Sequence, residues 1–163
     1  QVVEELKAER PNIKTFVTLS PVPGFAAWLA AQRKDNSSDL ISADQRLAFA
    51  ALDRPGWQTD PATAEALRAP LLAAAATYFL RARSAAKRVI DPVARFHLGN
   101  GARLERLNHL GDVSANGLAQ SHGLMVNYLY DLGQIEANHE AFAERSHIAA
   151  SDSVKAALPA LRS

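Results

Sequence analysis

The sequence predicts a single α+β domain with more helix than strand. Two segments, residues 13–19 and 123–130, are rich in β-branched and aromatic side chains, as is typical of strands. Most other segments begin with a helix-capping residue or with a proline at the first helical position. The 163 residues contain no internal repeat and no low-complexity linker, and this length suits one domain with one core.

Two prolines and a serine set the limits of the first four elements. A helix rarely continues into a proline, so the amphipathic segment before Pro11 ends there. Pro23 lacks an N–H donor and can occupy the first turn of a helix, while Ser42 offers a capping oxygen. The predicted elements are a helix at 2–10, a strand at 13–19, and helices at 23–34 and 43–52.

Two Asp-Pro pairs predict the starts of the central helices. Aspartate is a good N-cap and proline fits the next position, so helices are expected after Asp60 and after Asp91. Pro70 is expected to end the first of these helices and to open another one over residues 70–84. The helix after Asp91 leads within two turns to His97.

The last third of the chain predicts short strands that alternate with helices. The segment ARLERLN is ambiguous between strand and helix, and the Asn-Gly turn before it favours a strand. Ser114 is a suitable cap for a short helix. The predicted elements are a strand at 102–108, a short helix after Ser114, a strand at 123–130, and helices at 134–145 and 151–161.

The composition argues against several classes of protein. The 18 basic and 17 acidic side chains give a formal charge of +1, without the basic excess of a nucleic-acid-binding protein. No apolar run approaches the roughly 18 to 20 residues that span a bilayer, so we expect no membrane segment. The absence of cysteine removes disulfides and thiol nucleophiles, and it fits a cytoplasmic protein. None of the five histidines belongs to a close ligand pair, so no metal site is expected.

Three side chains stand where functional groups often lie. Ser20 ends a predicted strand just before a proline-rich turn, and His97 lies between two apolar residues ahead of a glycine-rich turn. Tyr130 closes the run NYLY in the second predicted strand. Each of them alone is more often a turn serine, a core histidine or a packed tyrosine. Nothing in the local pattern brings them together, because they are far apart in the sequence.

Three longer segments and, more weakly, the final predicted helix add a resemblance when they are read together. TFVTLSPVPGFAAWL, DPVARFHLGNGARLERLNHLGDVS and GLAQSHGLMVNYLYDL resemble the C-terminal catalytic part of the malonyl-CoA decarboxylase family. The resemblance covers nearly the whole chain, and residues 35–85 carry the least of it. It implies that residues 1–163 are the C-terminal portion of that catalytic domain. The helical N-terminal domain, the elements that bind the CoA pyrophosphate and an acidic site residue are then expected before Gln1.

The resemblance also implies a fold and a set of site residues. The family's catalytic part resembles the acetyltransferase fold, a mixed sheet flanked by helices, which would be incomplete here on its N-terminal side. Ser20, His97 and Tyr130 match the catalytic serine, histidine and tyrosine of the family motifs. Asn100 and Asn127 match the same motifs and are expected to bind substrate together with Ser20 and His97.

The activity implied by the resemblance is decarboxylation of malonyl-CoA to acetyl-CoA and CO2 through an enolate. A Ser/His pair would handle the proton, and no cofactor is expected because the thioester itself accepts the electrons. The resemblance further implies a role in fatty-acid and malonate metabolism and a non-covalent homo-oligomer of the full-length subunit. Two alternatives stay open, an acyl-CoA-dependent acyltransferase on the same fold and a non-catalytic helical interaction module. His109, where the family often has tryptophan, is interpreted as a packing change.

Overall fold

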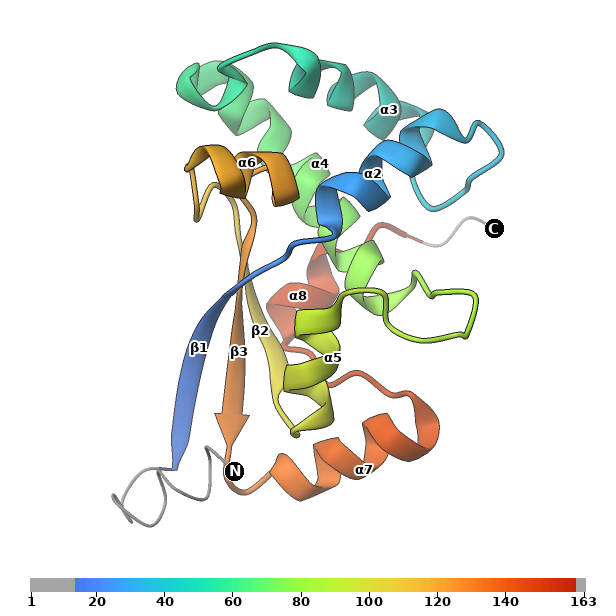
Figure 1. Ribbon diagram of the computed structural model, residues 1–163, viewed down its shortest axis with the longest axis vertical. Coiled ribbons are helices and arrows are strands. Elements are labelled where there is room, and N and C mark those ends of the chain that lie inside the picture. The colour runs from blue at the N-terminus through green and yellow to red at the C-terminus, as the bar shows by residue number, and fades with distance from the viewer. Residues whose placement is uncertain (1–13, 161–163) are drawn as a thin grey trace.

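The computed structural model describes residues 14–160, which form a three-stranded antiparallel sheet and a set of helices (Figure 1). The predicted helix at 2–10 lies outside the described residues. The strands are β1 (Thr15–Pro21), β2 (Arg103–Asn108) and β3 (Met125–Asp131). The helices are α2 (Phe25–Lys34), α3 (Ala43–Phe49), α4 (Pro61–Leu80), α5 (Pro92–Gly99), α6 (Ala115–Ser121), α7 (Ile135–Arg145) and α8 (Asp152–Ala157), with 3₁₀ turns at Ala50–Asp53 and Trp57–Thr59.

The sheet has the order β1-β3-β2, so the last strand in the sequence lies between the other two. Side chains alternate between the two faces of a strand. On β3 the residues Val126, Tyr128 and Tyr130 are buried, while the residues between them are only partly covered. In the β1–β3 register Ser20 lies opposite Val126 and Phe16 lies opposite Tyr130. The even-numbered residues of β1 and β3 therefore share one face.

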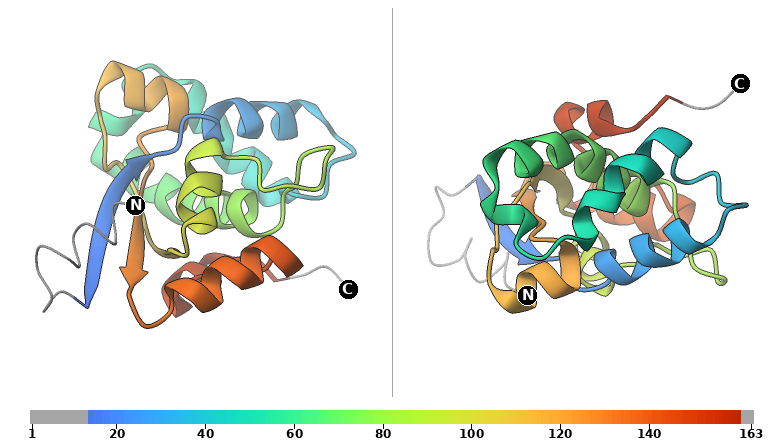
Figure 2. Two further views of the ribbon diagram at one scale, coloured as in Figure 1. Left: turned by 60° about the horizontal axis from the view of Figure 1, so that its bottom comes forward. Right: turned by 90° about the horizontal axis from the view of Figure 1, so that it is seen from above.

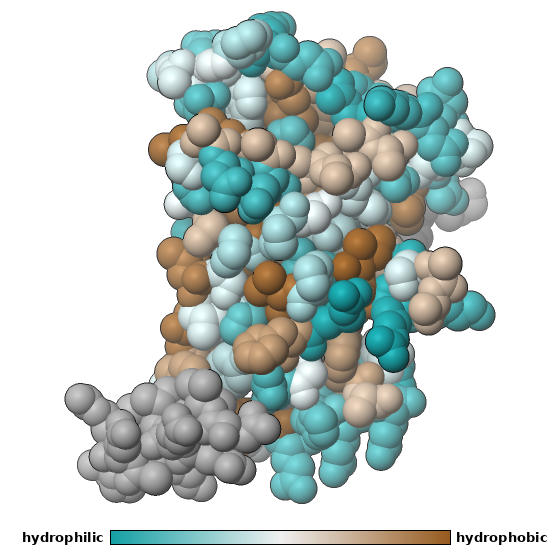
Figure 3. Space-filling view, in the orientation of Figure 1, coloured by the Kyte–Doolittle hydropathy of each residue, from teal (hydrophilic) through white to brown (hydrophobic). Residues whose placement is uncertain are grey.

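The other face of β1 carries exposed apolar side chains. Val17 is 52% exposed and Leu19 is 59% exposed. Figures 1 and 2 place β1 at one edge of the molecule, and apolar side chains lie along that edge in the space-filling view (Figure 3). The sheet is therefore packed on one face of β1 and open on the other.

Helix α4 is continuous, so the prediction that Pro70 would end one helix and open another is wrong. A proline inside a helix costs about 3 kcal/mol, because it removes one backbone hydrogen bond and crowds the carbonyl four residues earlier. That carbonyl belongs to Ala66, which is exposed and within reach of water. Leu67 and Leu71 on either side of the proline are buried, and each contributes about 1.5–3 kcal/mol. Packing into the core therefore keeps the helix intact.

Helix α5 is tied to α4 through a buried carboxylate. Asp91 is fully buried, and its Oδ2 accepts a hydrogen bond of 2.8 Å from the backbone N–H of Ala94. The hydroxyl of Tyr78 on α4 donates to Asp91 Oδ1 at 3.4 Å. Burial raises the pKa of the Asp91 carboxyl and that of the Tyr78 phenol. The predicted Asp-Pro helix start is confirmed, and the cap holds the start of α5 in place.

Most other predicted elements are confirmed, with shifted ends. Ser42 and Ser114 cap α3 and α6 as predicted, and the ambiguous segment after the Asn-Gly turn is strand β2. The prediction that Pro23 starts a helix is wrong, because the chain turns there and Gly24 is the N-cap of α2. Helix α8 ends earlier than predicted, because the residue before Pro159 is extended.

Within residues 14–160, no helix is both long enough and apolar enough to cross a membrane.

The two glycines that follow His97 predict opposite effects of the same substitution. A side chain at Gly99, the last residue of α5, would meet open space. Gly101 has a φ of +90°, and a side chain there would overlap the carbonyl of Ile135. Gly99→Ala should therefore leave stability unchanged or raise it by up to about 1 kcal/mol. Gly101→Ala should lower it by about 1–3 kcal/mol from backbone strain alone.

Urea unfolding of both variants beside the unchanged protein tests this pair. Equal losses at the two positions would contradict the geometry of the turn.

Candidate active site

Three side chains from separate elements form a chain of hydrogen bonds on the covered face of the sheet. Ser20 lies on β1, His97 on α5 and Tyr130 on β3. Ser20 Oγ lies 3.2 Å from His97 Nε2, and His97 Nδ1 lies 2.6 Å from the Tyr130 hydroxyl. Thr18 extends the chain, with its Oγ1 at 3.3 Å from Ser20 Oγ. Residues that are 77 and 33 positions apart in the sequence thus meet in space.

The backbone around the three side chains explains how they meet. Ser20 and Tyr130 point from neighbouring antiparallel strands to the same face, and Ser20 is 6% exposed. The ring of Phe16 stacks on Tyr130 with centroids 4.7 Å apart and holds the phenol in place. His97 lies near the end of α5, whose start is fixed by the Asp91 cap. The imidazole therefore enters the site from a rigid helix.

Burial determines the protonation of the two titrating groups. It lowers the pKa of His97, so the imidazole is neutral near pH 7 and carries one N–H. It raises the pKa of Tyr130 to about 12, so the phenol keeps its proton. Each of the three groups in the chain thus has a single proton to donate.

One arrangement of these protons gives every donor an acceptor. Within residues 14–160, the Tyr130 hydroxyl has one hydrogen-bond partner, His97 Nδ1. If Tyr130 donates to Nδ1, the imidazole carries its hydrogen on Nε2 and donates it to Ser20 Oγ. The Ser20 O–H is then free to donate to Thr18 Oγ1 or to a bound ligand. With the hydrogen on Nδ1 instead, the Tyr130 proton would have no acceptor among these hydrogen-bonded side chains. We therefore assign the Nε2–H tautomer to His97.

Asn100 and Asn127, which were expected at the site, take no part in the hydrogen bonds from Ser20 to Tyr130. Asn100 Nδ2 donates to the backbone carbonyl of Phe96 at 2.9 Å, and this bond closes the end of α5. Asn127 is on the opposite face of β3 from Tyr130, where its Nδ2 donates to the Thr18 carbonyl at 3.2 Å. Their hydrogen bonds hold the helix end and the strands together. A role for either in substrate binding stays a prediction.

Two aromatic residues beside the imidazole were missed in the sequence. Tyr128 stacks on His97 with ring centroids 4.3 Å apart and planes 21° apart. Phe96 is 60% exposed, and its ring meets the imidazole edge-on at 5.1 Å. The period-two alternation of β3 was the available signal for Tyr128, since it puts residues 128 and 130 on one face.

Two of the other histidines make hydrogen bonds to backbone carbonyls. His109 Nε2 donates to the Ala64 carbonyl at 2.9 Å, and its ring stacks on Trp57, which agrees with the packing role expected for it. His139 Nδ1 donates to the Gly99 carbonyl at 2.6 Å. In the part of the chain that the structure describes, no three histidine, aspartate or glutamate side chains gather as metal ligands would.

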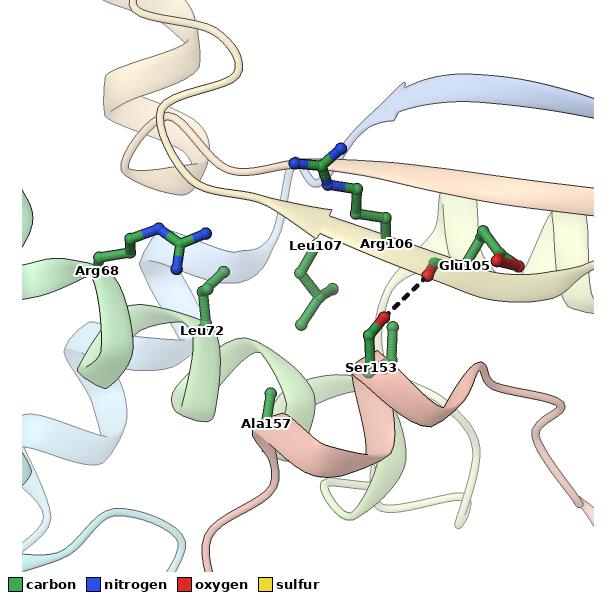
Figure 4. Close-up of a pocket in the computed structure, with 8 residues that line it drawn as sticks. Arg68, Leu72, Glu105, Arg106, Leu107, Ser153 and Ala157 are labelled. Atoms are coloured by element: carbon green, nitrogen blue, oxygen red, sulfur yellow. Dashed lines mark hydrogen bonds between the residues drawn. The ribbon is translucent and has the colours of Figure 1, made fainter.

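Among the pockets of the described residues, two larger ones lie outside the chain of hydrogen bonds. One has a volume of about 420 Å³ between α4, β2 and α8. In Figure 4 the side chains of Leu72, Leu107 and Ala157 lie in the space between these elements, whereas Arg106 points to the other side of β2. The other, of about 570 Å³, lies between α5 and α7. Phe96, the sequence neighbour of His97, is one of the residues that line the second pocket.

Comparisons with known proteins agree on one family. A family model described as the malonyl-CoA decarboxylase C-terminal domain matches residues 1–163. The mitochondrial malonyl-CoA decarboxylase of Anser anser anser is 34% identical over 94% of this chain and 34% of that protein. That of Rattus norvegicus is 33% identical over 94% of this chain and 35% of that protein. The chain thus spans about a third of the length of the curated relatives that it matches.

Solved structures give the same result. The malonyl-CoA decarboxylase structure from Rhodopseudomonas palustris has 60% identity and a TM-score of 0.92, over 98% of this chain and 36% of that one. The structure from Cupriavidus metallidurans has 36% identity and a TM-score of 0.74, over 96% of this chain and 42% of that one.

A partly buried histidine outside the chain of hydrogen bonds predicts a pH dependence of stability. His122 packs edge-on against Phe25 near the ion pair of Arg33 and Asp53. Burial, followed by the charge of Arg33, lowers the pKa of His122 to about 4. The unfolded chain takes up this proton below about pH 6.5, whereas the folded chain does so only near pH 4. The contribution of His122 to stability should therefore fall by up to about 3 kcal/mol as the pH is lowered from about 6.5 to about 4, and should change little below that.

His122→Asn removes the titrating group and tolerates the left-handed backbone at this position, where φ is 52°. Urea unfolding between pH 4 and pH 7 should show a flatter dependence in this variant. The exposed His147 provides the control, since His147→Asn should keep the full slope. An unchanged slope in His122→Asn would show that this residue does not contribute.

Proposed function

This chain belongs to the malonyl-CoA decarboxylase family, and we propose that it supplies the Ser20, His97 and Tyr130 part of an active site that converts malonyl-CoA to acetyl-CoA and CO2. The observation that carries the proposal is the continuous contact from Ser20 Oγ through both nitrogens of His97 to the Tyr130 hydroxyl. Such a chain is suited to moving a proton, and decarboxylation requires one.

The proposed reaction breaks the bond between the carboxylate carbon and the methylene carbon. The electron pair stays on the methylene carbon and spreads into the thioester as an enolate, and CO2 leaves. The methylene carbon then takes up one proton to give the acetyl group. The site has to hold the carboxylate out of the thioester plane, so that the breaking bond overlaps the π system, and has to place a proton donor beside the carbon.

The Ser20 hydroxyl is the group we propose to face the substrate. In the assigned tautomer Ser20 accepts from His97 Nε2 and has its own proton free. When that proton moves to the enolate carbon, the Nε2 proton replaces it on Oγ and the Tyr130 proton moves to Nδ1. The carbon of a thioester enolate is a far stronger base than a phenolate, so the sequence of transfers is favourable. To restore the starting state, the Nδ1 proton returns to Tyr130, the Ser20 proton returns to Nε2, and Ser20 Oγ takes up one proton from solvent.

Several properties of the whole protein are part of this proposal. The chain spans about a third of its curated relatives, so residues outside it are proposed to complete the CoA site. An acetyltransferase-like complete domain is compatible with the three-stranded sheet and its flanking helices. A homo-oligomer of complete subunits, a cytoplasmic location, a role in fatty-acid and malonate metabolism and chemistry without a cofactor remain predictions.

The proposal predicts a large loss of turnover when the chain of hydrogen bonds is cut. In the complete protein, His97→Ala should lower kcat by about 10²- to 10⁴-fold, which is the range for a positioned acid or base. Ser20→Ala should fall in a similar range. Because the two groups act as a unit, the double variant should be little worse than either single one. Release of CO2 and acetyl-CoA from malonyl-CoA is the measurement, together with the melting temperature of each preparation.

Two structural residues of the same types serve as controls. Ser121 is buried and bonded to the Gly117 and Leu124 carbonyls, and His109 is bonded to the Ala64 carbonyl. Ser121→Ala and His109→Ala should lower the melting temperature and leave kcat near normal. The same pattern in His97→Ala would instead make His97 a structural histidine. Acetyl transfer to an amine without release of CO2 would favour an acyltransferase.

A further inference from the structure

We propose that Tyr128 is a positioning residue, whose ring fixes the plane of the His97 imidazole so that its two nitrogens face Ser20 and Tyr130. The consequence for turnover rests on the function proposed above, whereas the consequence for the imidazole itself does not. Tyr128 belongs to none of the hydrogen bonds of the site, and only its ring contacts His97.

The contact between the two rings is close and nearly parallel. The centroids are 4.3 Å apart and the planes differ by 21°. Stacked aromatic pairs generally have centroids 4.5–7 Å apart, so these rings are in full contact. If the imidazole rotated about the bond to its Cβ, it would collide with the phenol ring. The stack therefore restricts the one rotation that would turn Nε2 away from Ser20 and Nδ1 away from Tyr130.

Tyr128 itself has little freedom to move. Its side chain is fully buried in the central strand of the sheet. On one side it pairs with Thr18 of β1 and on the other with Leu104 of β2. A ring held between two paired strands is a rigid surface on which a helix side chain can rest.

The hydroxyl of Tyr128 does not account for the position of the residue. It has no hydrogen-bond partner within residues 14–160. Burial, together with the nearby charge of Asp91, raises the pKa of this phenol, so it stays neutral. An unpaired buried hydroxyl generally lowers stability. The ring, and not the hydroxyl, is therefore the part of Tyr128 that acts on His97, so Tyr128→Phe should keep this effect.

The test uses the complete protein with ¹⁵N-labelled histidine and three variants. Tyr128→Phe keeps the ring, and Tyr128→Met removes it but fills similar space; Tyr128→Leu takes the place of the methionine variant if that one does not fold. Phe79→Leu is the matched control, because Phe79 is equally buried and its ring contacts Tyr78 and not His97. For each variant, the ¹⁵N shifts of the His97 ring report its tautomer, and steady-state kinetics give kcat and KM for malonyl-CoA.

Tyr128→Phe should keep the His97 shifts and kcat of the unchanged protein. Tyr128→Met should shift the His97 nitrogens toward an average of the two tautomers and lower kcat by about 10- to 100-fold, with KM little changed. Phe79→Leu should lower the melting temperature without altering the His97 shifts.

Three results would overturn the proposal: unchanged His97 shifts in the ring-deleted variant, equal changes in Phe79→Leu, or a loss of kcat in Tyr128→Phe. If the unchanged protein does not decarboxylate malonyl-CoA, the proposed function fails. The ¹⁵N comparison still decides the role of Tyr128 in that case.

Discussion

The register of β1 against β3 is the constraint on which the candidate site depends. Ser20 and Tyr130 reach the same face only because Ser20 pairs with Val126 and Phe16 pairs with Tyr130. Since side chains alternate along a strand, a slip by one residue would turn Ser20 to the opposite face. The buried aromatic residues of β3 hold this register, because such a slip would also expose them. The strand register therefore determines both the burial of these aromatic side chains and the position of Ser20 beside His97.

His97 is carried not by the sheet but by helix α5, which is fixed at both ends. Asp91 caps the start of α5 and is bonded to Tyr78 on α4. At the far end Gly101 takes a positive φ that lets the chain pass close to Ile135. A buried carboxylate is costly to desolvate, but here it accepts hydrogen bonds that fix the helix. Both anchors hold His97 at the sheet without any contact to the imidazole itself.

Burial then turns this geometry into a defined set of protons. The same covered face that packs the sheet lowers the pKa of His97 and raises that of Tyr130. A neutral imidazole between two hydroxyl groups can pass a proton in one direction when the receiving end meets a strong base. A charged imidazole in the same place would donate from both nitrogens and leave no acceptor for Tyr130. The packing of the core and the chemistry of the site therefore have one physical cause.

The sequence by itself determined the local features. Caps at Ser42, Asp91 and Ser114 were predictable because an N-cap bonds to residues two or three positions away. Ser20, His97 and Tyr130 were found through their resemblance to family motifs, since no local pattern relates residues so far apart. Only the tertiary structure decided the features that depend on distant neighbours. Core packing carries α4 through Pro70, the pairing of β1 with β3 brings Ser20 and Tyr130 to one place, and the packing of α5 stacks His97 on Tyr128. Each of these depends on burial against another element, which a local sequence pattern does not contain.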